Sequence, residues 1–298
     1  MLLLLGGSGY VGTAFQRELQ RQKIEFISLS RSQVNYYDVA LLSKTLDKIR
    51  PSFLINAAGY TGKPNVDSCE TDKHNCLLGN AVLPGIIRVA CERLGIPWGH
   101  VSSGCIYTGN KEDCSGFTEL DPPNFTFRTN NCSFYSGTKA LGEECLLQSD
   151  STYIWRLRMP FSNEDSPRNY ISKLLRYDTL LDATNSLSNL TEFVIACLQC
   201  WDRRLPFGIY NVTNTGSVTT RQVVEWMKQY INVSREYRFF ESEKEFYQMA
   251  ARTPRSNCVL DNSKLRTAGI DIATIDESLQ DAMKNWRLDS ENERSRKW

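Results

Sequence analysis

Two residue patterns in this sequence could carry out acid–base chemistry on a carbonyl group. Tyr135 and Lys139 form Y-x-x-x-K, and residues four apart lie on one face of a helix. An ammonium beside a phenol lowers the pKa of the phenol, which can then donate a proton to a carbonyl oxygen. In the string VSSGCIY, the hydroxyl of Ser103, or of Ser102 as the alternate, could bond the same oxygen. Together these residues predict a reductive site.

Cys105 is a candidate proton-transfer group in the same string. It lies two residues after Ser103, so on an extended strand end its thiol would point to the same side. A cysteine here is either a buried apolar residue, which is common in strands, or an acid or base. The chain has only two histidines, the residue type that most often transfers protons. Other groups would therefore have to perform such steps.

A glycine-rich turn predicts that the chain binds a dinucleotide. Gly6, Gly9 and Gly12 form G-x-x-G-x-x-G between an apolar run and a helical pattern. Such glycines allow a tight turn and let the backbone approach a pyrophosphate at the helix N-terminus. The expected cofactor contacts are Gly6, Ser8, Gly9, Tyr10, Val11, Gly12, Asn56, Ala57 and Ala58, together with Tyr135 and Lys139.

The end of the second predicted strand indicates which dinucleotide is bound. An acidic residue there would accept hydrogen bonds from an unphosphorylated ribose, but this chain has Ser30 and Arg31. A guanidinium suits a 2′-phosphate, which favours NADPH, with NADH as the alternative. Asp38 could accept a hydrogen bond from the adenine amino group, or it could equally be the N-cap of the following helix.

The elements that must position these residues alternate between strands and helices. Alternation of this kind indicates an α/β fold, a doubly wound parallel sheet of the Rossmann type, with a smaller mixed α/β lobe. Predicted strands lie at 2–5, 24–30, 52–59, 97–107, 152–159 and 208–214. Predicted helices lie at 13–22, 37–50, 74–95, 134–148, 219–231, 243–251 and 274–286.

Composition excludes several classes of function. The 298-residue chain has a formal net charge of +1, so it lacks the basic field that nucleic acid or an anionic membrane would attract. The opening run MLLLL ends at Gly6 and is too short for a signal peptide or a membrane span. Ten cysteines show no metal-ligand spacing, and the C-x-x-C of Cys197 and Cys200 lies in an apolar helical stretch. We expect free thiols, no metal and a cytoplasmic location.

Longer strings carry a resemblance to a known family. With the glycine triad, the Y-x-x-x-K pair and NAAG at 56–59, the chain resembles the extended short-chain dehydrogenase/reductases. Within them it is most similar to the dTDP-4-dehydrorhamnose reductase branch, and there to the plant-type bifunctional nucleotide-rhamnose synthases, which are 3,5-epimerase/4-reductases. The resemblance runs from residue 1 to about 285. The strings that carry it are NAAGYTGKPNVDSCE, SGCIY, SFYSGTKA, RLRMPFS, SPRNYISKLLRY, GIYNVTN and PRSNCVLDNSKL.

The resemblance implies an activity and a second reactive pair. Such enzymes invert C3 and C5 of a nucleotide-linked 4-keto-6-deoxyglucose and reduce C4 with NADPH, giving the nucleotide-L-rhamnose. The family's epimerisation pair matches Cys105 and Lys173, with acid and base roles left open. Ser103 and Tyr135 would hold the enolate oxygen meanwhile.

The resemblance also implies a set of substrate ligands. For these residues we expect a purely structural role at least as much as a substrate contact. Arg255 matches the family's pyrophosphate-binding arginine, and Arg168 is a second candidate. Asn169 could touch the sugar, and Lys63 and Asn65 would line the loop over the cofactor. The remaining expected substrate contacts are Ser103 and Gly104.

Several alternatives stay open at this point. The chain could be a reductase without epimerase activity, or a non-catalytic NADP-binding regulatory subunit like that of methionine adenosyltransferase. UDP is favoured over dTDP by the similarity, a separate 4,6-dehydratase would supply the keto-sugar, and a homodimer is compatible with the fold. The expected lobes are a cofactor domain at 1–160 with a returning segment near 206–224, and a substrate lobe at 161–205 and 225–298.

Overall fold

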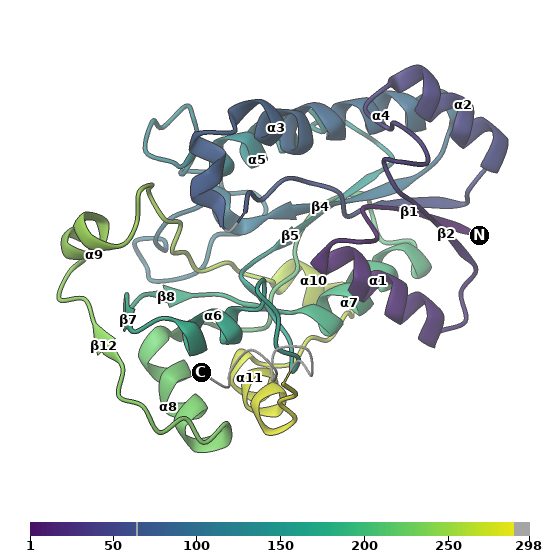
Figure 1. The fold of residues 1–298 in the computed structure, drawn as a ribbon. Helices are drawn as coiled ribbons and strands as arrows, with labels where there is room; N and C mark the ends of the chain where they lie inside the picture. Colours follow the sequence, from purple (N-terminus) through teal and green to yellow (C-terminus); the bar gives the residue numbers. More distant parts are fainter. Residues whose placement is uncertain (64, 289–298) are drawn as a thin grey trace.

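A six-stranded parallel sheet forms the centre of the protein (Figure 1). The computed structural model describes residues 1–63 and 65–288, so the last residues of the expected substrate lobe, 289–298, lie outside the described residues. The strand order is β10-β5-β4-β3-β1-β2. The strands are β1 (Leu2–Leu5), β2 (Phe26–Leu29), β3 (Phe53–Asn56), β4 (Trp98–Ser103), β5 (Thr152–Leu157) and β10 (Gly208–Asn211).

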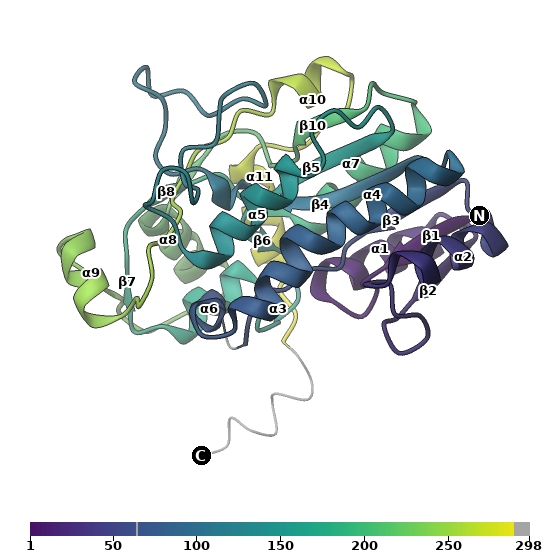
Figure 2. The same cartoon turned by 90° about the horizontal axis from the view of Figure 1, so that it is seen from above.

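The apolar strand runs exist because helices cover both faces of the sheet. In β1, Leu2 and Leu4 belong to the core under α1 and α7, whereas Leu3 and Leu5 belong to the core under α2 and α4. Figure 2 shows these helices lying along the strands from above. The helices against the sheet are α1 (Tyr10–Arg21), α2 (Val39–Ile49), α4 (Leu83–Leu94), α5 (Phe134–Glu144) and α7 (Leu190–Asp202). The expected doubly wound parallel fold is confirmed.

The long helix expected at 74–95 is divided in the structure. It consists of α3 (Lys73–Leu77), a single π-helical turn η2 (Leu78–Val82) and α4. Asn80 lies in the π turn, where its amide accepts a hydrogen bond from the Tyr60 amide (2.9 Å) and donates one to the Tyr60 carbonyl (2.8 Å). Its nitrogen also donates to Thr138 Oγ1 on α5 (3.2 Å). The wider turn thus ties the loop after β3 to α5.

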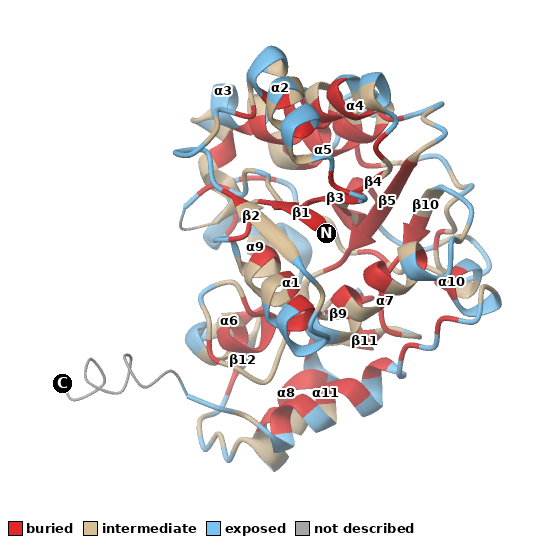
Figure 3. Ribbon diagram, turned by 90° about the vertical axis from the view of Figure 1, so that its right-hand side faces the viewer, coloured by how far each residue is buried: buried red, intermediate tan, exposed pale blue. Residues whose placement is uncertain are grey.

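The smaller lobe has its own apolar core, seen in Figure 3 as the buried inner faces of α8 and α11. Val223, Met227 and Leu279 are fully buried where these two helices pack. Its helices are α6 (Tyr170–Arg176), α8 (Thr220–Tyr230), α9 (Glu243–Met249) and α11 (Ile275–Lys284). Its short strands are β6 (Pro160–Phe161), β7 (Thr179–Leu180), β8 (Thr184–Asn185), β9 (Ser188–Asn189), β11 (Val218–Thr219) and β12 (Arg238–Phe239).

The lobes interleave along the chain. Strand β10 joins the large sheet by pairing with β5, within the segment expected to return to it. Helix α7, which falls in the segment expected in the substrate lobe, instead packs on the sheet beside α1 because Phe193 and Cys197 contribute to that core. Short helix α10 (Ser263–Thr267) also lies beside β10.

The polar loop after β4 is fixed by a distant segment. The Gly109 amide donates to the Asn257 carbonyl (2.6 Å), and the Val259 amide donates back to Gly109 (3.1 Å). Further on, the Phe117 amide donates to the Val259 carbonyl (2.9 Å). Backbone pairing over this length makes residues 107–121 an ordered wall beside the end of β4.

Three features of the described residues bear on the expected cellular setting. Within 1–63 and 65–288, no helix is both long and apolar enough to cross a membrane. All ten cysteines fall in the described part of the chain, and each has a free thiol there. The same part holds no group of three metal-ligating side chains, and Cys197 and Cys200 are buried in α7.

Candidate active site

The glycine turn after β1 has the geometry of a dinucleotide cradle. Gly6 has φ +76°, and the Gly9 amide donates to the Gly6 carbonyl (3.0 Å). A Cβ at Gly12 would lie 2.0 Å from the same carbonyl oxygen, so only glycine lets α1 approach the turn. Gly9 caps α1 without a side-chain bond, which leaves the first amides of the helix to an anion. These residues fit a pyrophosphate.

The residues after β2 leave one cation exposed at the turn. Ser30 and Arg31 are both exposed, and the Arg31 guanidinium lies 5.9 Å from the centre of the Tyr37 ring. Asp38 is the N-cap of α2, accepting from the amides of Ala40 (2.8 Å) and Leu41 (3.0 Å). Of the two roles considered for Asp38, the structure therefore contains the helix cap.

Asn56 braces the strand end from within the protein. Its side chain is fully buried, with Nδ2 2.9 Å from His100 Nδ1 and Oδ1 accepting from the Ala58 amide (3.1 Å). Both ends of the side-chain amide thus have protein partners, and a cofactor contact of Asn56 stays a prediction. Ala57 and Ala58 remain partly exposed beside the glycine turn, where a Cβ at Gly6 would meet Ala58 N at 2.4 Å.

The residues expected at the reductive site come together at the carboxyl end of β4. Tyr135 and Lys139 lie one turn apart on α5, and the Tyr135 phenol lies near enough to the Ser103 side chain for that side chain to lower its pKa. Lys139 Nζ donates to the Val101 carbonyl (3.0 Å), which holds α5 against the strand. Ser102 points to the other face, where its hydroxyl donates to Glu143, so Ser103 is the hydroxyl that faces Tyr135.

Burial controls the charges of this group. It raises the pKa of Tyr135 well above its ordinary value and lowers the pKa of Lys139. The expected lowering of the Tyr135 pKa is not found, because burial is the largest effect on the phenol and raises its pKa. The phenol consequently stays protonated at neutral pH, which is the state that can donate a proton.

Cys105 reaches Ser103 by a different route from the one expected. It lies in the 3₁₀ turn η3 (Gly104–Ile106), not on an extended strand end, and its amide donates to Ser103 Oγ (3.2 Å). The side chains of Ser103 and Ser136 lie near the thiol and lower its pKa. Burial raises the pKa of the thiol, the largest effect on it. The turn thus keeps a protonated thiol beside the serine that meets Tyr135.

Gly104 is closed over by the distant segment that follows Arg255. A Cβ at Gly104 would lie 2.5 Å from Leu260 Cδ1. The Gly104 carbonyl accepts from Cys258 Sγ (3.3 Å), and Ser256 Oγ donates to the Tyr107 carbonyl (2.6 Å). Contact with substrate at Gly104 stays a prediction.

Lys173 approaches from the second lobe. It lies on α6 beside a cavity of about 200 Å³ that Arg168, Tyr170 and Tyr177 also line. Burial lowers the pKa of Lys173, and the charges of Arg168 and Arg255 lower it further. A lysine in this setting loses its proton more readily than an exposed lysine.

The two arginines expected to bind phosphate already have protein partners. Arg255 makes a two-bond ion pair with Asp67 (2.6 and 2.7 Å), and Thr253 donates to the same carboxylate (2.8 Å). Arg168 donates to the Gly62 carbonyl (2.6 Å). The loop that follows β3 is therefore held to the second lobe by the groups expected to hold the substrate.

Three other expected ligands behave differently from one another. Lys63 is exposed, and Asn65 caps the 3₁₀ helix η1 (Val66–Glu70) by accepting from the Asp67 amide (2.9 Å). Asn169 is fully buried and caps α6, donating to the carbonyls of Ser162 (2.8 Å) and Glu164 (2.7 Å). The Asn169 amide is therefore enclosed by protein groups, and its contact with the sugar stays a prediction.

Comparison with known proteins decides the family. The model of the RmlD substrate binding domain matches residues 1–288. The chain belongs to this family. It is 33% identical over 282 residues to the bifunctional dTDP-4-dehydrorhamnose 3,5-epimerase/dTDP-4-dehydrorhamnose reductase of Arabidopsis thaliana, covering 93% of this chain and 90% of that protein. A trifunctional UDP-rhamnose enzyme of the same plant is 32% identical over 93% of this chain but only 40% of its own length.

Solved structures share the fold of this RmlD-family chain. The UDP-rhamnose synthase L780 of Acanthamoeba polyphaga mimivirus has a TM-score of 0.87 at 22% identity, covering 95% of this chain and 98% of that one. The dTDP-4-dehydrorhamnose reductase of Bacillus anthracis, solved with NADP, has a TM-score of 0.78 at 18% identity over 96% of both chains. The expected resemblance is confirmed.

Sequence reasoning missed several residues of this RmlD-family site. Ser136 follows Tyr135 directly and meets the Cys105 thiol, a neighbour that the helical spacing could have revealed. Asp67 pairs with Arg255 across 188 positions, and no local pattern signals such a pair. Arg158 is buried and donates to Asn185 and to the Ser256 carbonyl, which fastens the segment after Arg255 to β5.

Proposed function

We propose that this protein is a 3,5-epimerase/4-reductase that converts a UDP-linked 4-keto-6-deoxyglucose into UDP-L-rhamnose with NADPH. The observation that carries the proposal is the position of Ser103, which accepts a hydrogen bond from the Cys105 amide (3.2 Å) and whose side chain lowers the pKa of both the Tyr135 phenol and the Cys105 thiol beside it. A reductase needs only the phenol. A buried thiol beside the same serine adds a second proton donor at the carbonyl.

Reduction requires one proton from the protein. NADPH, when bound along the glycine turn, supplies the hydride for C4. Tyr135 donates its hydroxyl proton to the C4 oxygen, and Ser103 donates a hydrogen bond to that oxygen as negative charge develops. Lys139 stabilises the resulting phenolate, so the products are the alcohol and NADP⁺ once solvent reprotonates the phenol.

Epimerisation requires a base and an acid on opposite faces of the sugar. The ketone at C4 makes the protons at C3 and C5 acidic. We assign Lys173 as the base because burial and two arginines lower its pKa, and Cys105 as the acid because burial raises the pKa of its thiol. The base removes a proton, the enolate oxygen accepts hydrogen bonds from Ser103 and Tyr135, and the thiol returns a proton to the other face.

The nucleotide part of the substrate is recognised by cations of the second lobe. Arg255 and Arg168 exchange their partners in the loop after β3 for the pyrophosphate, whose oxygens match two-bond arginine geometry. The preference for UDP rests on the similarity to the trifunctional UDP-rhamnose enzyme. The 4-keto substrate has to be made from a nucleotide-glucose by a 4,6-dehydration.

A deuterium experiment tests this function. Purified protein is incubated with NADPH and UDP-4-keto-6-deoxyglucose in D₂O, and the product is analysed by NMR. Wild type should give rhamnose with deuterium at C3 and C5, and Tyr135→Phe should reduce at least 100-fold more slowly, within the range for loss of a proton donor. Cys105→Ala should give no inversion at one or both centres, whereas Cys91→Ala, which removes a buried thiol from α4, should invert both as wild type does.

Other outcomes separate the alternatives. Reduction without deuterium at C3 or C5 in wild type would identify a 4-reductase that depends on another epimerase. Tight NADPH binding without turnover of dTDP- or UDP-linked keto-sugars would identify a regulatory binding protein. A Cys105→Ala variant that still makes deuterated rhamnose would leave Cys105 as a buried residue of the 3₁₀ turn and refute its catalytic role.

A further inference from the structure

One buried ion pair joins α5 to β5 beside the end of β4. Glu143 lies on α5 one turn beyond Lys139, and Arg156 lies on β5 opposite Ser102 in the β4–β5 register. Their side chains are 5% and 2% exposed. Arg156 Nη2 and Nε donate to the Glu143 carboxylate at 2.8 and 3.1 Å.

Each partner of the pair makes a further bond toward a reactive residue. Glu143 accepts from the hydroxyl of Ser102, the residue next to Ser103. Arg156 Nη1 donates to the Tyr107 hydroxyl (3.0 Å), two residues after Cys105, and its guanidinium lies 5.2 Å from the centre of the Tyr107 ring. Ser102 and Tyr107, which lie on either side of the segment that carries Ser103 and Cys105, therefore bond to the same ion pair from opposite ends.

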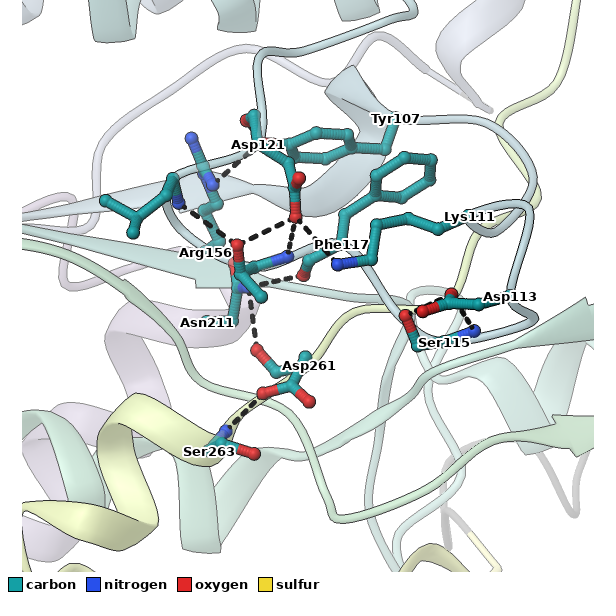
Figure 4. Close-up of polar contacts among 12 residues, drawn as sticks. Tyr107, Lys111, Asp113, Ser115, Phe117, Asp121, Arg156, Asn211, Asp261 and Ser263 are labelled. Carbon is teal, nitrogen blue, oxygen red and sulfur yellow. Dashed lines mark hydrogen bonds and ion pairs between the residues drawn. The ribbon is translucent and has the colours of Figure 1, made fainter.

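Tyr107 extends the connection into the ordered loop, as Figure 4 shows. Its hydroxyl donates to the Asp121 carbonyl (2.6 Å), and its ring stacks on Phe117 at 4.8 Å. Asp121 accepts from Thr118 and pairs with Lys111 at 3.5 Å. The turn that carries Cys105 is consequently fixed to the wall of residues 107–121.

We propose that Ser102, Glu143, Arg156 and Tyr107 are positioning residues that set the reduction pair and the Cys105 turn relative to one another. The Ser102 end fixes Ser103 against Tyr135 and Lys139. The Tyr107 end fixes the turn η3 that presents Cys105. Neither hydroxyl contacts the reacting atoms, and both act through the ion pair. The inference rests on the proposed function for its two separate readouts, reduction at C4 and exchange at C3 and C5.

The test replaces Ser102 and Tyr107 one at a time and leaves the ion pair intact. Loss of Glu143 or Arg156 would leave an unpaired buried charge and unfold the chain. Ser102→Ala should slow reduction about 10- to 100-fold, as misplacement of catalytic groups does, and Ser102→Thr should restore it. Tyr107→Phe should slow deuterium exchange by a similar factor and affect reduction less. The ratio of exchange to reduction should therefore fall in Tyr107→Phe and stay near the wild-type value in Ser102→Ala, because Ser103 and Tyr135 serve both steps, while KM stays within twofold.

Two matched control variants remove the same kinds of hydroxyl group at positions away from the ion pair of Glu143 and Arg156. Ser278→Ala removes a buried serine hydroxyl that donates to Glu192, and Tyr210→Phe removes a buried phenol hydroxyl that donates to the Pro206 carbonyl (2.7 Å). Both should keep the wild-type ratio at a similar change in melting temperature. Unchanged reduction in Ser102→Ala, an unchanged ratio in Tyr107→Phe, or equal losses in the controls would overturn the proposal.

Hydrogen exchange separates this inference from the proposed function. If wild type turns over no keto-sugar, the proposed function fails. Exchange at the Lys139 and Glu143 amides then decides the coupling on its own: faster exchange in Ser102→Ala than in Ser278→Ala supports it, and equal exchange refutes it. If wild type reduces without epimerising, only the Tyr107→Phe variant loses its kinetic readout, which is deuterium exchange at C3 and C5. The hydrogen-exchange rate of the Cys105 amide in Tyr107→Phe then tests in the same way whether Tyr107 fixes the turn η3.

Discussion

Replacing Gly12 by alanine tests whether close backbone approach shapes the dinucleotide site. A Cβ there would lie 2.0 Å from the Gly6 carbonyl oxygen, whereas ordinary contacts are about 3.5 Å apart. Helix α1 and the turn must then separate by more than about 1 Å. Such overpacking costs about 1–3 kcal/mol, so NADPH should bind roughly 5- to 150-fold more weakly if the strain falls on the bound form.

Gly85→Ala is the matched control for this prediction. Gly85 lies within α4, and the nearest atom to its added Cβ is 3.9 Å away. The change should stabilise the helix by about 0.5–1 kcal/mol and leave NADPH binding unaltered. NADPH fluorescence titration and thermal unfolding without cofactor measure the two effects. Gly12→Ala binding NADPH within twofold of wild type would refute the argument that this contact forms the cradle.

Three further predictions concern charged side chains. Lys173→Met should raise the free energy of unfolding at pH 7, because the lowered pKa of Lys173 means that the folded state holds the ammonium less well than the unfolded chain. That gain should shrink as the pH rises above the folded-state pKa and vanish above about 10.4, where wild-type Lys173 is neutral in both states. Urea unfolding at pH 7 and pH 10 measures the gain. A difference in unfolding free energy that stays constant between these pH values would contradict the lowered pKa. Asp67→Asn should bind UDP up to about fivefold more tightly by calorimetry, since it frees Arg255 from a partly exposed ion pair; weaker binding would mean that Asp67 orients the arginine for the ligand. Arg31→Ala should lower the ratio of kcat/KM with NADPH to that with NADH by about 10- to 100-fold, the value of a hydrogen bond to a charged group, and an unchanged ratio would remove Arg31 from the phosphate site.

The framework of the fold was predictable because its signals are local. Buried parallel strands such as Leu2–Leu5 are short apolar runs, and the glycines after them mark the turn into a helix. The Y-x-x-x-K spacing placed Tyr135 and Lys139 on one helical face for the same reason. Each of these patterns depends on fewer than about ten consecutive residues.

The contacts that complete the site could not be predicted from the sequence alone. Alternation along a strand assumed that Cys105 continued β4, but Gly104 begins a 3₁₀ turn there. Asn56 and Asn169 were expected to contact ligands, but in the structure both side chains are fully buried. The pair of Asp67 with Arg255 depends on how the two lobes meet, which no short pattern encodes.

The segment that closes over Gly104 has a consequence for the order of events during synthesis. Strands β1 to β5 are complete at Leu157, whereas Ser256, Cys258 and Leu260 emerge about a hundred residues later, roughly 5–20 s at ordinary translation rates. A nascent chain can therefore form its glycine turn and most of the large sheet well before it has a finished sugar site. Ribosome-bound chains stalled between these points should capture NADPH without any turnover, and activity should arise only near the end of translation.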